Sequence, residues 1–148
     1  MSGNILAKRA PRATALIVAC GFLFGGAAWA GKPVTLSIAI HNADYDAGFV
    51  HVALYDKASW ISSVAQPVRT ASRHPGGNVT IIPLADVKPG KYVIEAYQDR
   101  NNNGQIDEDE PHGISQNACR HKSECHPSFQ DAYVTVKAGD NAISIDLD

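Results

Sequence analysis

The amino-acid sequence predicts an all-β domain, an antiparallel two-sheet sandwich of about seven strands that is immunoglobulin-like or prealbumin-like in kind. Short runs of residues alternate between apolar and polar, which is the period of a half-buried strand. Turn-forming residues separate these runs, in a chain with 12 glycines and 8 prolines among 148 residues. After residue 30, no stretch has the period of a long helix. A small open barrel is the alternative arrangement of the same strands.

The expected strands follow one another at short spacing. Residues 34–40 alternate strictly and are rich in β-branched side chains, and residues 49–55 alternate again. Pro67 cannot donate a hydrogen bond to a neighbouring strand, so a strand that begins there suits the edge of a sheet. Residues 99–131 form a long polar excursion, and ordered loops of that length are usually functional. The expected strands are residues 34–40, 49–55, 67–72, 78–84, 91–98, 132–137 and 142–147.

Residues 1–30 have the pattern of a secretory signal peptide. Three basic residues precede an uncharged apolar run over residues 13–28, and Ala28 and Ala30 are the small residues that a cleavage site requires. The run is about 16 residues long, which is short of the roughly 20 that span a bilayer, so a membrane anchor is disfavoured. We therefore expect cleavage after Ala30 and a single mature domain over residues 31–148.

The net charge of the mature chain excludes some partners, and Cys20 offers an alternative to simple export. The sequence has 13 Lys and Arg and 15 Asp and Glu. Three of the basic residues lie in the leader, so the mature chain is acidic and is a poor candidate for binding nucleic acid or an anionic membrane. Cys20 follows a short apolar run as in a lipobox, so lipidation of Cys20 is an alternative that we rank below simple export.

Residues 99–110 match the twelve-residue loop that binds calcium in many proteins. Calcium prefers six to eight oxygen ligands, and a curled chain presents alternate side chains to it. Gly104 stands at the sixth position, where the chain must turn sharply, and Ile106 stands at the eighth, which is usually apolar. The expected ligands at positions 1, 3, 5, 7, 9 and 12 are Asp99, Asn101, Asn103, Gln105 through its backbone carbonyl, Asp107 and Glu110.

The residues around this loop do not predict an EF-hand. A strand and not a helix precedes Asp99, and Pro111 follows Glu110 directly and favours an extended backbone there. Glu110 is therefore the least secure ligand, and Glu108 or Asp109 could replace it. The alternative interpretation is a solvated connector between strands, whose acidic residues only keep it soluble.

Cys119 and Cys125 are the two cysteines that remain after the expected cleavage. An even number of cysteines in an exported domain predicts a disulfide, here closing a seven-residue loop. If both thiols stayed reduced, they could bind copper or zinc together with nearby histidines. The spacing matches no standard zinc site, so we favour the disulfide. The histidines of this alternative transition-metal site are His112, His121 and His126.

A series of short motifs occurs in order along residues 33–148. They read VHVALY at 50–55, LADVKPGKY at 84–92, YQD at 97–99, NNNG at 101–104, GISQNA at 113–118 and PSFQDA at 127–132. The series resembles the bacterial exported family catalogued as domain of unknown function 2141. This resemblance implies a secreted β-sandwich without an assigned enzyme activity. It also implies an Asp/Asn/Gly-rich loop after the same strand, which corresponds to residues 99–107.

Two details modify what the resemblance implies. The segment between Ala118 and Pro127 departs from the family pattern, because a loop bracketed by cysteines replaces the Gly- or Arg-containing stretch expected there. A role of that loop cannot be transferred from the family. The turn at Pro89-Gly90 followed by Tyr92 is also similar to carboxypeptidase regulatory-like sandwiches, which would imply a non-catalytic module.

The functional prediction is an exported, non-catalytic module, periplasmic or secreted, with a structural calcium ion. The chain lacks the nucleophile elbow, the phosphate-binding loop and the metalloprotease helix motif. We expect a monomer without a transmembrane segment in the mature chain, whose partner is an envelope protein or a glycan. One alternative is a periplasmic copper or zinc protein that uses the histidine and cysteine loop. A less favoured alternative is a small metal-dependent hydrolase that acts near Asp99 and Asp107.

Overall fold

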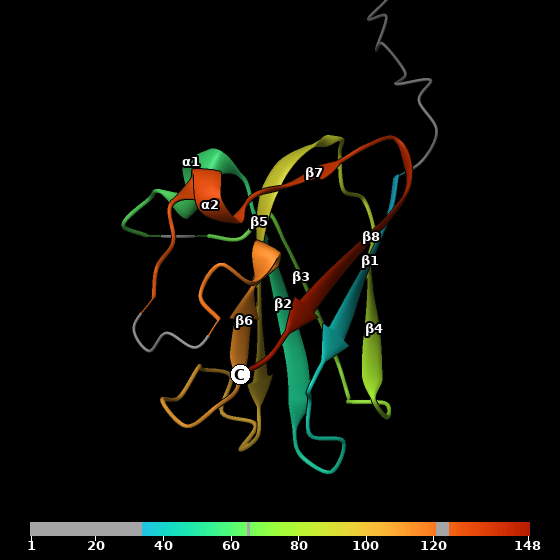
Figure 1. Ribbon diagram of the computed structural model, residues 1–148, viewed down its shortest axis with the longest axis vertical. Coiled ribbons are helices and arrows are strands. Elements are labelled where there is room, and N and C mark those ends of the chain that lie inside the picture. The colour runs from blue at the N-terminus through green and yellow to red at the C-terminus, as the bar shows by residue number, and fades with distance from the viewer. Residues whose placement is uncertain (1–33, 65, 121–124) are drawn as a thin grey trace, which may run out of the picture. The chain divides into compact units, whose positions relative to one another are not determined.

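The computed structural model describes residues 34–148 apart from residue 65 and residues 121–124 (Figure 1). The expected cleavage site, Cys20 and His121 lie outside the described residues. Within the described part of the chain, no helix is both long and apolar enough to cross a membrane.

The described residues form eight strands and three short helical turns, which confirms the predicted all-β class. The helical turns are α1 (Lys57–Trp60), α2 (Phe129–Ala132) and a 3₁₀ turn at Ser115–Asn117. The strands are β1 (Val34–His41), β2 (Phe49–Tyr55), β3 (Arg69–Arg73), β4 (Val79–Leu84), β5 (Gly90–Asp99), β6 (His112–Ile114), β7 (Val134–Val136) and β8 (Gly139–Asp146). The sequence did not predict β6, because three residues inside a polar excursion are too short to show a period.

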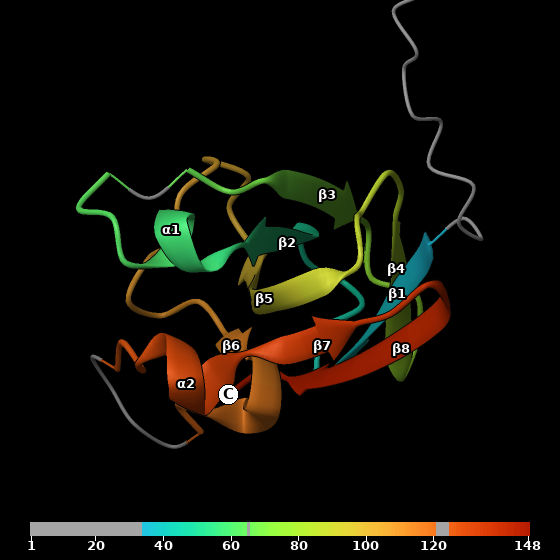
Figure 2. The same ribbon diagram turned by 90° about the horizontal axis from the view of Figure 1, so that it is seen from above.

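Two sheets make up the predicted sandwich. One has the order β4-β1-β8, and the other has the order β3-β2-β5-β6 with β7 also paired to β5. Figure 2, which looks down on the strands, shows β2, β3 and β5 on one side of the interior and β1, β4 and β8 on another. Most pairs are antiparallel as expected, but β1 and β8 are parallel.

The main core lies between the sheets and follows the alternation that predicted the strands. In β2, Val50, Val52 and Leu54 are buried, and the residues between them face outward. In β5, Ile94 and Ala96 point into the same core. Because neighbours in a strand point to opposite faces, Val93 belongs to a second core on the outer face of the sheet.

This second core is formed by α1, β5 and the excursion after β5. Trp60 of α1, Phe129 of α2 and Cys119 pack with Val93 and Ile114 on the outside of the five-stranded sheet. The Trp60 indole N–H donates to the carbonyl of Pro127 at 3.0 Å, which fixes the excursion against α1. The described residues between 115 and 133 therefore include several that cover part of the sheet.

β6 also connects the two sheets at one edge. The backbone N–H of Asp148 donates to the carbonyl of His112 at 3.2 Å, and the N–H of His112 donates back at 3.3 Å. Gly113 lies so close to β8 that an added Cβ atom would lie 2.3 Å from the carbonyl oxygen of Asp146. The sandwich is thus partly closed on this side, in the manner of the barrel considered as the alternative.

Candidate functional site

The acidic loop, residues 99–110, begins on a buried carboxylate. Asp99 is the last residue of β5, pairs in register with Phe49 of β2, and is 2 % exposed. Its Oδ1 accepts the N–H of Asn103 at 3.1 Å, and its Oδ2 accepts the N–H of Gly104 at 2.8 Å. The Nε2 atom of His51 lies 3.7 Å from the same Oδ2. The first expected ligand is therefore held rigidly by the sheet.

Three further expected ligands converge beside Asp99. The side-chain amides of Asn101 and Asn103 both donate to Oδ2 of Asp107, at 2.7 and 2.8 Å. Positions 3, 5 and 9 of the acidic loop are thus in contact with one another. Each asparagine carbonyl oxygen accepts one backbone N–H, from Asn103 at 2.9 Å and from Gln105 at 2.8 Å. A carbonyl oxygen has two lone pairs, so each keeps the capacity for one more bond.

The backbone of the loop curls as the pattern predicted. Gly104 has φ +77°, in the left-handed region that glycine adopts at no steric cost, and Asn102 has φ +58°. The side chains of Gln105 and Ile106 are exposed.

Glu110 closes the loop. Its side chain is buried, with 4 % exposure, even though Pro111 follows it. One carboxylate oxygen accepts the N–H of Arg100 at 2.7 Å, and the other accepts the N–H of Asp107 at 3.2 Å. Glu108 and Asp109, which were considered as its replacements, are exposed. Glu110 therefore joins the two ends of the acidic loop through backbone hydrogen bonds.

The carboxylates around the base of the loop affect a neighbouring tyrosine. Tyr97 stacks on His51, with ring centroids 4.9 Å apart. Burial raises the pKa of the Tyr97 hydroxyl, and the carboxylates of Asp99 and Glu110 raise that pKa further. This end of the sheet therefore has a negative potential, which favours a cation over an anion.

The donor set of the loop consists of oxygen atoms, but its acidic side chains alone do not form a metal site. Among the described residues, no three His, Cys, Asp or Glu side chains form a group that could hold an ion. A hard cation in the loop would need the amide oxygens of Asn101 and Asn103 and a backbone carbonyl in addition to the carboxylates. Such a set of carboxylate, amide and carbonyl oxygens fits calcium and does not fit a softer metal.

The cysteines and histidines of the alternative site are arranged differently. The sulfur atoms of Cys119 and Cys125 are 2.06 Å apart, the distance of a disulfide bond. His126 stacks on Trp60 with ring centroids 4.6 Å apart, whereas His112 lies on β6. Among the described residues, the two cysteines are thus paired with each other, and His126 and His112 lie in different surroundings.

We expect loss of the disulfide to weaken the domain by about 2.4 kcal/mol, from the chain entropy of a seven-residue loop. Replacement of Cys119 and Cys125 by serine should lower the free energy of unfolding in urea by that amount. Reduction of the unmodified protein should have the same effect and should leave the double variant unchanged. Two free thiols in the denatured, unreduced protein would contradict the prediction and support a reduced metal-binding pair.

The sequence did not predict the role of Gln98, which lies next to Asp99 and binds the loop between β1 and β2. This side chain is fully buried. Its amide nitrogen donates to the carbonyls of Asp44 and Ala47, both at 2.6 Å, and its oxygen accepts the N–H of Asp44 at 2.8 Å. The loop between β1 and β2 is thereby fixed to the end of β5 beside Asp99. A glutamine in strand register carries no signal for such a role, because its partners lie about 50 residues away in the chain.

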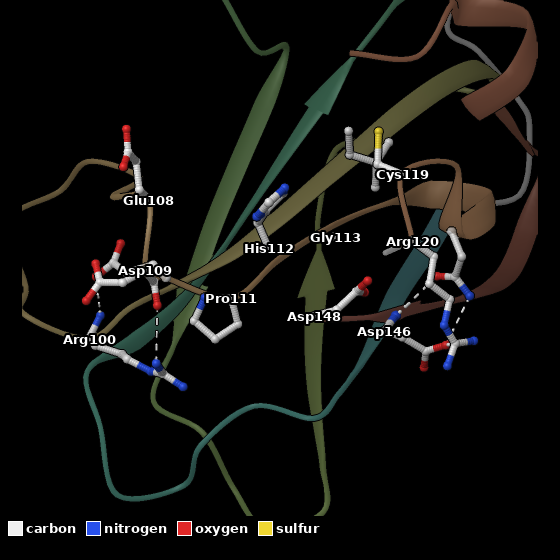
Figure 3. A pocket seen from close by; sticks show the side chains of 13 residues that line it. Arg100, Glu108, Asp109, Pro111, His112, Gly113, Cys119, Arg120, Asp146 and Asp148 are labelled. Atoms are coloured by element: carbon white, nitrogen blue, oxygen red, sulfur yellow. Dashed lines mark hydrogen bonds and ion pairs between the residues drawn. The ribbon is translucent and has the colours of Figure 1, made fainter. Parts of the chain in front are cut away.

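A pocket of about 490 Å³ adjoins the acidic loop (Figure 3). We call it the β6 pocket. Figure 3 shows Arg100 at one side, Arg120 at the other, and Pro111 and Gly113 between them. The pocket is lined by residues 108–114 together with Arg100, Asn117, Cys119, Arg120, Asp146 and Asp148. The end of the acidic loop is therefore one wall of the pocket.

The sequence matches one known protein family. Residues 38–144 match a family described as an uncharacterized protein conserved in bacteria, DUF2141. The chain belongs to this family. The match confirms the resemblance inferred from the ordered motifs, and it spans both the acidic loop and the segment that contains Cys119 and Cys125. No curated protein and no solved structure matches the chain significantly.

Proposed function

We propose that this DUF2141 protein is an exported, non-catalytic module of the bacterial cell envelope whose acidic loop is stabilised by calcium. The observation that carries the proposal is the contact of Asn101 and Asn103 with Asp107, next to the buried Asp99 carboxylate that accepts the Asn103 N–H. Calcium would replace the two amide donors that now approach Asp107. Glu110 and the carbonyl of Gln105 would complete an all-oxygen set.

Calcium would act on the stability of the loop and not as a switch. Asp99, Asp107, Glu108, Asp109 and Glu110 place five acidic side chains in twelve residues beside Arg100 alone among basic residues. Their mutual repulsion is reduced by a bound divalent cation. The loop connects two strands of one sheet and no pair of helices flanks it, so binding has no hinge to open.

Export and the absence of catalysis are supported by different observations. The leader pattern and the paired cysteines both fit an oxidising compartment outside the cytoplasm. The hydrolase alternative would need a carboxylate that can act as a base toward a bound water. Instead, the Asp99 carboxylate accepts two backbone N–H groups of its own loop, and the Asp107 carboxylate accepts the side-chain amides of Asn101 and Asn103, which are structural roles.

We expect millimolar calcium to raise the melting temperature of the protein. The ion binds only the folded state, so a hundredfold excess over Kd stabilises by about 2.7 kcal/mol. Two ligands are neutral asparagines, so we expect a Kd on the order of 10⁻⁴–10⁻³ M, as in extracellular modules. Asp99→Ala should abolish the rise in melting temperature. Asp107→Asn should abolish it too, and this variant keeps the size of the side chain at a ligand that is less buried than Asp99. Differential scanning calorimetry at constant ionic strength measures both effects.

The controls separate calcium from other cations and from general charge. Asp140→Asn, in an exposed acid of β8, should keep the full calcium response. Magnesium should not replace calcium, because it requires a smaller octahedral site. Identical melting curves in calcium and chelator would show that the loop is only a solvated connector. Copper or zinc found by mass spectrometry in protein purified without chelator would instead favour the transition-metal alternative.

A further inference from the structure

The β6 pocket combines hydrogen-bonding groups with apolar surface. The guanidinium group of Arg100 donates to the carbonyl of Asp109 at 3.3 Å. The guanidinium group of Arg120 contacts the carboxylate of Asp146 at 3.4 Å. A guanidinium has five N–H donors, so both arginines have donors beyond these bonds. Pro111 and Gly113 lie between them and offer C–H and backbone surface (Figure 3). The volume of about 490 Å³ lies in the range of about 300–1,000 Å³ that holds small molecules.

The charge of the pocket restricts what could occupy it. Among the described residues that line it are five carboxylate side chains and two guanidinium groups, a net charge of −3 with His112 neutral. An anion would therefore be repelled, whereas a ligand that both donates and accepts hydrogen bonds finds partners on every side. Hydroxyl groups on a ring with apolar C–H faces have this combination of properties.

The wall opposite the acidic loop is held in a costly backbone conformation. Gln116 and Asn117 have φ values of +64° and +50°, which are uncommon for residues other than glycine. Asn117 exchanges hydrogen bonds with β8. Its amide donates to the Asp146 carboxylate at 3.0 Å, and its oxygen accepts the Asp146 N–H at 3.3 Å. Backbone of this kind persists only where the surrounding structure fixes it, so this part of the pocket wall is held rigidly.

We propose that the β6 pocket binds a neutral or amino-bearing carbohydrate, and that calcium in the acidic loop strengthens this binding. The calcium part rests on the proposed function. Glu110 joins the N–H groups of Arg100 and Asp107, so an ion held by Asp107 and Glu110 also fixes the wall at residues 108–111. By linkage, calcium and the carbohydrate raise each other's affinity by the same factor.

The proposal is tested by ¹⁵N NMR titration of protein expressed from the full sequence, in calcium and in chelator. The probes are neutral trisaccharides of glucose, galactose, mannose and N-acetylglucosamine, a glucosamine trimer, trigalacturonate and spermidine. We expect at least one neutral or amino trisaccharide to shift the resonances of Arg100, Asn117 and Arg120. We expect its affinity to be at least about fivefold higher in calcium.

Matched arginine variants locate the binding. Arg120→Gln should weaken binding about tenfold, because it removes charged donors to the ligand. Arg73→Gln changes an arginine on β3 that does not line the pocket and that donates to the carbonyl of Ile81 at 3.0 Å, and it should have no effect. Because Arg120 is half exposed, its replacement should leave the fold intact, as the unperturbed resonances of β1 and β4 would show.

Several results would overturn the proposal. One is that none of the neutral or amino trisaccharides shifts the pocket resonances at 10 mM. Others are that trigalacturonate or spermidine binds more tightly than every saccharide of the neutral and amino group, or that Arg120→Gln binds normally. If calcium stabilises the protein but no saccharide binds, the pocket proposal fails alone. If a saccharide binds equally in calcium and chelator and calcium does not change the melting temperature, the proposed calcium function fails and the pocket assignment stands.

Discussion

We expect Gly48→Ala to destabilise the domain by about 2–5 kcal/mol, which would be among the largest effects of any single substitution in the chain. Gly48 has φ +53°, and the left-handed region costs other residues about 1–2 kcal/mol. A Cβ atom would also lie 1.7 Å from the carbonyl oxygen of Asp99 and 2.8 Å from the Cα of Arg100. Those atoms belong to the backbone of β5 and the loop that follows, so they cannot rotate away, and overpacking adds about 1–3 kcal/mol.

Urea unfolding measures this cost, and Gly77→Ala is the matched control. Gly77 has φ +84°, but no atom lies within 4 Å of its Cβ position. Its replacement should cost only the conformational part, about 1–2 kcal/mol. Equal losses in the two variants would show that the close approach of Gly48 to Asp99 has no energetic weight. Gly48→Ala should also weaken the calcium response, because it displaces the residue that starts the acidic loop.

The strands could be predicted because their signal is local. The alternation of Val50, Val52 and Leu54 with outward residues follows from burial of one face, and the structure has this strand at the predicted residues. Gly104 likewise shows its turn in the sequence, because the loop needs a left-handed residue there. The parallel pairing of β1 with β8 could not be predicted, because about one hundred residues separate the partners.

The acidic loop could be predicted from local sequence, whereas the β6 pocket could not. The proposed calcium ligands lie within twelve consecutive residues, so their spacing is visible in the sequence. The pocket brings together Arg100, Asn117 and Asp146, and no single short motif contains all three. Its walls meet where Asp148 pairs with His112 and where Asn117 exchanges hydrogen bonds with Asp146 of β8. Contacts of this kind depend on tertiary pairing, which neither composition nor periodicity reports.

Ser115→Ala should lower the free energy of unfolding by about 2–6 kcal/mol. β6 pairs with residues 95–97 of β5, and β7 pairs with residues 90–92 of the same edge. Ser115 fills the gap between them and is fully buried. Its hydroxyl accepts the N–H of Ile94 at 3.0 Å and donates to the carbonyl of Ala132 at 2.6 Å. Alanine would leave both buried backbone groups without a partner, at about 1–3 kcal/mol each.

Hydrogen exchange distinguishes this explanation from a general loss of packing. The Ile94 amide should lose protection in Ser115→Ala by more than the amides of Val93 and Glu95, because only Ile94 depends on the hydroxyl. Ser128→Ala is the control, since that hydroxyl donates to the exposed carboxylate of Asp131, and its loss should change stability by less than about 0.5 kcal/mol. If exchange at Ile94 followed its neighbours, the hydroxyl bridge would not be what holds the excursion to β5. The disulfide and the packing of Trp60 and Phe129 would then hold the excursion in place.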